Sequence, residues 1–115
     1  MIEVAKKAAE LVASIRESQN KIQEEYLRTI RGLGSLVIQN GLAGAILFTI
    51  KKESKEVVEH LDQLIEIKTG VSKLSKKIED GDIYKQKYLQ IQIAALDCIK
   101  WLKRYAEILL GGDSA

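Results

Sequence analysis

The spacing of apolar positions along the chain predicts helices from its first residues. Near the N-terminus, one stripe recurs at alternating intervals of three and four residues, which places its members on a single helix face. The stripe comprises Ala5, Ala8, Val12, Ile15, Gln19, Ile22 and Tyr26. The polar run 18–20 predicts a break in this pattern, followed by a second segment from Asn20 to Arg31.

Glycines divide the apolar centre of the chain. Gly32-Leu33-Gly34 predicts the end of the second segment, since glycine accepts the left-handed backbone that a helix exit needs. Asn40-Gly41 predicts a turn between a short helix over 36–39 and an apolar helix over 42–52. Residues 32–50 carry no charge and meet the roughly 18-residue length criterion for a membrane span. Because polar residues and four glycines interrupt this stretch, we predict a buried pair of short core helices and no membrane contact.

The second half of the chain predicts one amphipathic helix, one short segment and one long helix. The amphipathic helix covers 54–69 and ends at Gly70, and a short lysine-rich segment covers 71–78. Asp80-Gly81-Asp82 predicts a turn before a final helix over 83–110. That helix carries the most regular stripe, which comprises Tyr84, Tyr88, Ile91, Ala95, Cys98, Leu102, Tyr105 and Leu109.

Together these patterns predict an all-α fold. We expect residues 1–115 to form a compact single-domain helical bundle of about five to six helices with a long C-terminal helix. The sequence contains no proline, so no helix interior is interrupted by a proline ring. Residues 111–115 are predicted to form a loose tail after the last helix.

The net charge of +2 is small, but the charges are unevenly distributed. Residues 26–52 carry four basic side chains and no acidic one, whereas residues 53–66 are predominantly acidic. A third group, on the final helix, sets basic side chains beside Trp101 and Tyr105, a combination that suits phosphates and exposed bases. The candidate RNA-binding residues are therefore Arg28, Arg31, Lys51, Lys52, Lys100, Lys103 and Arg104.

An alternative interpretation of the basic group on the final helix is an ordinary salt-bridged surface. Asp97 and Glu107 fall on the same helix face as Lys100 and Arg104, at spacings that allow ion pairs. Trp101 and Tyr105 could equally belong to the core.

Catalytic patterns are weak in this sequence. Cys98 and His60 are the single cysteine and histidine, but Cys98 falls in the apolar stripe, where a thiol usually acts as a small buried hydrophobe. The carboxylates Glu56, Glu59, Glu79 and Asp82 form an arrangement that looks like the magnesium site of the all-α nucleotide pyrophosphohydrolases. Acidic residues three apart on an exposed helix are also common without any metal. We therefore expect no catalytic residue, no metal and no cofactor.

Two further features bear on the compartment. A single cysteine permits no disulfide within the chain and favours a reducing environment. The N-terminal residues lack the charged and apolar regions of a signal peptide. A cytoplasmic location is the expectation.

Several segments resemble the small subunit of the type III-B CRISPR RNA-targeting (Cmr) effector complex. The resemblance lies in Tyr26-Leu-Arg-Thr-Ile-Arg31, in Leu36-Val-Ile-Gln-Asn-Gly-Leu-Ala43 with Leu47-Phe48, and in a closing helix with Trp101-Leu102-Lys103-Arg104. These segments occur in the same order over nearly the whole chain. One departure is the absence of a proline near Leu33-Gly34, where the family pattern leads us to expect one.

This resemblance implies a non-catalytic subunit that stacks in several copies along the groove holding guide RNA and target RNA. It implies contacts with other subunits of the complex and with RNA phosphates, for which Arg28, Arg31, Lys103 and Arg104 match the family's basic positions. Three alternatives stay open: the corresponding type III-A small subunit, the pyrophosphohydrolase, and a plain helical adaptor without nucleic acid.

Overall fold

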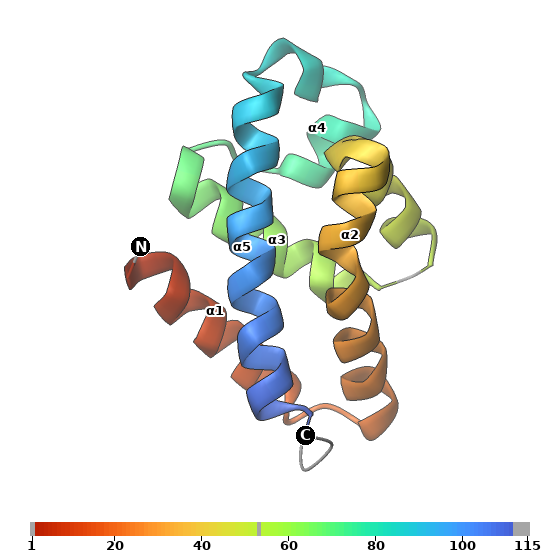
Figure 1. Ribbon diagram of the computed structural model, residues 1–115, viewed down its shortest axis with the longest axis vertical. Coiled ribbons are helices and arrows are strands. Elements are labelled where there is room, and N and C mark those ends of the chain that lie inside the picture. Colours follow the sequence, from red (N-terminus) through yellow and green to blue (C-terminus); the bar gives the residue numbers. More distant parts are fainter. Residues whose placement is uncertain (1, 53, 112–115) are drawn as a thin grey trace.

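The computed structural model describes residues 2–52 and 54–111, which form helices and no strand (Figure 1). The elements are α1 (Ile2–Ile15), α2 (Asn20–Lys51), α3 (Lys55–Thr69), α4 (Leu74–Glu79), the 3₁₀ helix η1 (Asp82–Lys85) and α5 (Tyr88–Leu109). The predicted all-α fold with a long C-terminal helix is confirmed. Most of the predicted tail, residues 112–115, lies outside the described residues.

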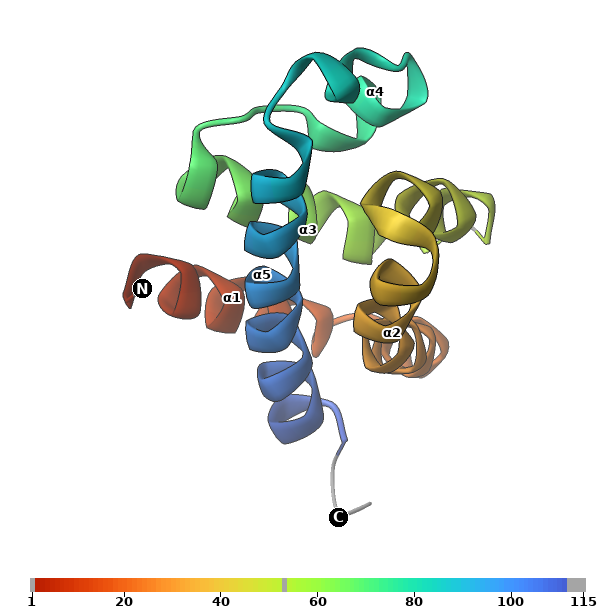
Figure 2. The same cartoon turned by 45° about the horizontal axis from the view of Figure 1, so that its top comes forward.

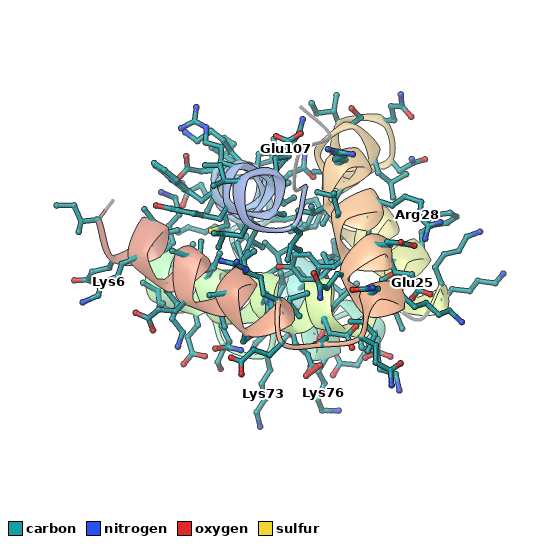
Figure 3. The ribbon with its side chains drawn as sticks, turned by 90° about the horizontal axis from the view of Figure 1, so that it is seen from below. Lys6, Glu25, Arg28, Lys73, Lys76 and Glu107 are labelled. Atoms are coloured by element: carbon teal, nitrogen blue, oxygen red, sulfur yellow. The ribbon has the colours of Figure 1, made fainter. Side chains whose placement is uncertain are left out.

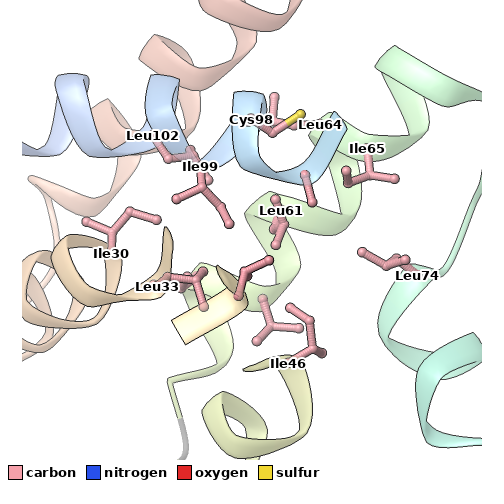
Figure 4. Close-up of a cluster of buried hydrophobic side chains, with 14 of the residues drawn as sticks. Ile30, Leu33, Ile46, Leu61, Leu64, Ile65, Leu74, Cys98, Ile99 and Leu102 are labelled. Carbon is pink, nitrogen blue, oxygen red and sulfur yellow. The ribbon is translucent and has the colours of Figure 1, made fainter. Parts of the chain in front are cut away.

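Helix α5 is the centre of the arrangement, with α1, α2 and α3 all packed against it (Figures 1 and 2). Its buried residues follow the predicted stripe through Ile91, Ala95, Cys98 and Leu102. Beyond Leu102 the buried position is Ala106, and the predicted Tyr105 and Leu109 are half-buried. Figure 4 shows part of the core, where side chains from α2, α3, α4 and α5 converge. This packing explains why α5 is long: it supplies one continuous apolar face to three other helices.

Helix α5 begins five residues later than the sequence predicts, at Tyr88 rather than Ile83. The backbone at Gln86 is extended (φ −94°, ψ 178°), which interrupts helical hydrogen bonding. Ahead of this break, Ile83 is fully buried, whereas Tyr84, placed on the buried stripe by its spacing, is 65% exposed. The break therefore turns the preceding segment so that its isoleucine, and not its tyrosine, reaches the core.

Helix α2 does not end at Gly32-Leu33-Gly34, so that prediction was wrong. The helix continues because Leu33 is buried in the core and Gly34 lies against α5. A Cβ atom at Gly34 would lie 3.8 Å from Cγ2 of Ile99, which is an ordinary van der Waals contact. Gly34 therefore lies in the contact between α2 and α5 and does not end the helix.

The bend in α2 lies at Gly41, where the Asn40-Gly41 turn is predicted. Gly41 has φ 79° and ψ 162°, a combination that is essentially restricted to glycine. The bend leaves the next backbone N–H groups without helical partners, and α5 supplies them. Leu42 N–H donates to Oε1 of Gln92 at 2.9 Å, and Ala43 N–H donates to the hydroxyl of Tyr88 at 2.9 Å.

The bend also bears on the fold of the uncharged stretch over residues 32–50. By its length, and by the mean hydropathy of 1.6 of an 18-residue window within it, Asn20–Lys51 could cross a membrane. In the fold, the backbone turns at Gly41, and both halves contribute buried side chains such as Val37, Leu42 and Ile46. The stretch thus belongs to two core helical segments that meet at Gly41, but the first is the end of a segment that begins at Asn20 and not the predicted short helix over 36–39.

Candidate nucleic-acid interface

A groove lies between the N-terminal half of α2 and the end of its second half. Beyond Gly41 the chain returns toward its earlier turns, and the hydroxyls of Thr29 and Ser54 are joined by a 3.0 Å hydrogen bond. The groove has a volume of about 840 Å³ and is open to solvent. Its apolar lining comes from Ile22, Leu33, Leu36 and Phe48.

Basic side chains surround this groove. Lys21 and Arg28 lie on the first half of α2 and Lys52 lies just beyond its end, whereas Glu25 is the one acidic residue among the described lining residues. Figure 3 shows Arg28 and Glu25 on the outer side of α2, far from Lys6 on α1. The fold thus places Arg28 and Lys52, which the sequence assigned to two separate predicted helices, at the same groove.

Phe48 is the aromatic component of the groove. Its ring is 49% exposed, and Nζ of Lys52 lies 5.3 Å from the ring centroid. Sequence reasoning missed Lys21. It also missed that Phe48 lies close to the basic side chains. The helical spacing of Lys21 to Arg28, two turns on one face, is the signal that could have found the lysine.

Arg31 does not line the groove, although its spacing from Arg28 predicted a shared face. Its Nε pairs with Oε2 of Glu107 on α5 at 3.4 Å. Both side chains are nearly half exposed, so this pair contributes little to stability. Arg31 links α2 to α5, and its charge is already partly balanced.

The basic group on α5 forms a separate surface. Lys100 pairs with Asp97 at 3.0 Å, and Lys68 of α3 pairs with the same carboxylate at 3.2 Å. The hydrogen bond from Lys100, together with Lys68, lowers the pKa of Asp97. For Lys100, the predicted salt-bridged surface is therefore confirmed.

The other side chains of that surface lie around the indole ring of Trp101. Cζ of Arg104 and Nζ of Lys100 lie 5.2 Å and 5.4 Å from its ring, and Tyr105 stacks beside it with 6.4 Å between ring centroids. Both rings are half-buried, so they are neither core side chains nor fully exposed ones. Lys103 and, at the end of α2, Lys51 are exposed. Six of the seven candidate residues are thus distributed over two surfaces and one interhelical ion pair, and Lys51 is exposed outside the groove lining.

The single cysteine and the single histidine are both buried. Cys98 is fully buried, and burial raises the pKa of its thiol to about 12, so it stays protonated. His60 is also buried, at 8% exposure, rather than at a helix rim, and shares a 2.8 Å hydrogen bond with the hydroxyl of Tyr26. Within residues 2–52 and 54–111, no three His, Cys, Asp or Glu side chains are grouped closely enough to hold a metal ion.

One acidic residue of α3 departs from its predicted position on the solvent face. Asp62 is half-buried, and its carboxylate accepts hydrogen bonds from the backbone N–H and the hydroxyl of Ser75 at 3.1 and 2.6 Å. Burial raises the pKa of Asp62 despite these bonds. The carboxylate holds the first turn of α4 against α3.

Comparison with known proteins identifies the family. The family described as CRISPR-associated protein (Cas_Cmr5) matches residues 2–109. The chain is also 42% identical over 113 residues to the CRISPR system Cmr subunit Cmr5 of Thermotoga maritima, covering 97% of this chain and 85% of that protein. No solved structure matches the chain significantly. The chain belongs to the Cmr5 family of CRISPR-associated proteins, the small-subunit family of the type III-B Cmr complex.

Proposed function

We propose that this chain is a non-catalytic subunit that contacts RNA phosphates through the groove of α2. The observation that carries the proposal is the convergence of Arg28, Lys52 and Lys21 at one open groove with a single opposing carboxylate among the described lining residues. Neutralising phosphates with exposed cations supplies affinity without reading sequence, because it releases counterions. A subunit with this role needs no reactive group.

The partners in this proposal are other subunits of a cytoplasmic Cmr effector complex, further copies of the chain, and the guide and target RNA. The related Thermotoga protein bears the name of a Cmr subunit. Ile38 on α2 and Leu89 and Ile93 on α5 are about 70% exposed, and large apolar side chains left in solvent favour protein contacts. The separate acidic and basic segments suit stacking of unlike surfaces.

The assembly proposal predicts that the tagged protein, gently isolated from its native host, brings down a multi-subunit particle that carries short guide RNAs. Proteins and RNA in the eluate are identified by mass spectrometry and sequencing. Recovery of the chain alone, or with one unrelated protein and no RNA, would contradict the proposal.

The RNA proposal predicts that the double variant R28E/K52E binds single-stranded RNA more weakly than the wild type and with a weaker salt dependence. If each cation neutralises one phosphate, the slope of log affinity against log salt falls by about 1.4, at about 0.7 per contact on a single strand. Fluorescence anisotropy between about 25 and 200 mM salt measures this slope. Arg31 is left unchanged, because R31E would place two acidic side chains together at Glu107.

The matched control is K6E/K73E, which changes the net charge equally. Both lysines are exposed, and Figure 3 shows them away from Arg28. The control should keep nearly the wild-type slope. Equal losses in the two double variants would mean that net charge, and not the groove, governs RNA binding.

A further inference from the structure

Phe48 is the only phenylalanine of the chain, and half of its surface faces solvent at the groove. Leaving so large an apolar ring half exposed forgoes part of its burial free energy. The ring lines the groove together with the half-buried Leu36 on the facing turns of α2. The groove therefore offers an apolar wall for a flat partner, in addition to its cations.

The cations lie close to that wall. Nζ of Lys52 lies over the Phe48 ring, 5.3 Å from its centroid, and Arg28 lines the same groove from the opposite helical half. A flat ring that stacks on that face of Phe48 displaces the lysine head, which then pairs with an anion attached to the ring. The hydroxyls of Thr29 and Ser54, paired at 3.0 Å, add hydrogen-bonding groups at the same groove.

The combination of a flat apolar surface, cations and hydroxyls matches the parts of one nucleotide, which are a base, a phosphate and a ribose. Base stacking on an aromatic side chain contributes to single-strand binding without sequence preference. The groove volume of about 840 Å³ lies within the usual range of small-molecule sites. An acidic peptide would use the cations but has no comparable need for the exposed ring.

We infer that this groove holds one unpaired nucleotide of single-stranded RNA, with its base against Phe48 and its two flanking phosphates at Arg28 and Lys52. The inference rests on the proposed function and goes beyond it, because it adds a base contact to the phosphate contacts. It predicts that the subunit distinguishes RNA that carries bases from the same backbone without them.

The test compares F48A with L47A, using the full chain at about 50 mM salt. Leu47 is a close control, since it is 46% exposed, adjoins Phe48 in sequence and does not line the groove. The probes are a labelled oligouridylate and an abasic oligomer of equal length. F48A should bind the oligouridylate about tenfold more weakly, as for the loss of one stacked base, and should bind the abasic oligomer as the wild type does. L47A should match the wild type with both probes.

An NMR titration with uridine monophosphate gives a second readout at millimolar ligand. Backbone signals of Thr29 and Gly32 at the groove should shift, and those of α1 should not. If R28E weakens oligouridylate binding but F48A does not, the nucleotide site is overturned and the phosphate contacts stand. If the wild type binds neither RNA nor the monophosphate, or binds only an acidic peptide, both proposals are overturned.

Discussion

Replacing Gly41 with alanine is expected to lower the free energy of unfolding by about 3 kcal/mol. The backbone at this position has φ 79° and ψ 162°, where an L side chain is strained. A Cβ atom would also come 3.3 Å from the hydroxyl of Tyr88, which is closer than ordinary contact. That hydroxyl accepts a hydrogen bond from the N–H of Ala43, so any shift that relieves the contact weakens a helix cap.

A matched substitution in the same helix should act in the opposite direction. Gly32 has helical geometry, and a Cβ atom there meets no other heavy atom within 4 Å. Gly32→Ala is therefore expected to raise the free energy of unfolding by up to about 1 kcal/mol, through helix propensity alone. Urea unfolding of both variants measures the two changes. Similar effects of the two substitutions would show that the Gly41 backbone is not the restricted element described here.

These two glycines illustrate how far the sequence predicts the fold. The Asn40-Gly41 turn was identified from the local sequence, because glycine tolerates a positive φ whatever its tertiary neighbours are. Gly34 was misinterpreted as a helix end, since its role depends on Ile99, which is distant in sequence and adjacent only in the folded chain. Apolar periodicity gave the helices, whereas the tertiary contacts between them decided which glycines interrupt a helix.

The candidate interface likewise combines features that the sequence predicts with features that only the fold produces. Charge clustering identified Arg28 and Lys52 from the sequence, but their shared groove exists only because α2 folds back at Gly41. Arg31 was grouped with Arg28 by spacing, and its pairing with Glu107 depends on the approach of α5. Local patterns therefore identify which side chains are basic, and the packing of α2 and α5 determines which of them line the groove and which form ion pairs.

His60 is expected to make the protein less stable in mildly acidic solution. Burial, opposed by Glu56 and reinforced by Lys7, lowers the pKa of His60 to about 4. In the unfolded chain the pKa is about 6.5, so between pH 6.5 and 4 the unfolded state binds a proton that the folded state does not. Stability from this residue is therefore complete above pH 6.5 and is lost as the pH falls toward 4. A shift of this size corresponds to about 3 kcal/mol.

His60→Gln isolates this contribution, because glutamine does not titrate and still offers Tyr26 a polar partner in place of the 2.8 Å hydrogen bond. The free energy of unfolding is measured by urea for both proteins at pH 7.5 and pH 4.5. Between these values the wild type should lose about 2.5 kcal/mol more than the variant. Carboxylates such as Asp62, whose pKa is raised by burial and which acts in the opposite direction, contribute equally to both proteins and cancel in the comparison. Equal losses in the two proteins would mean that His60 is protonated in the folded state as readily as in the unfolded chain.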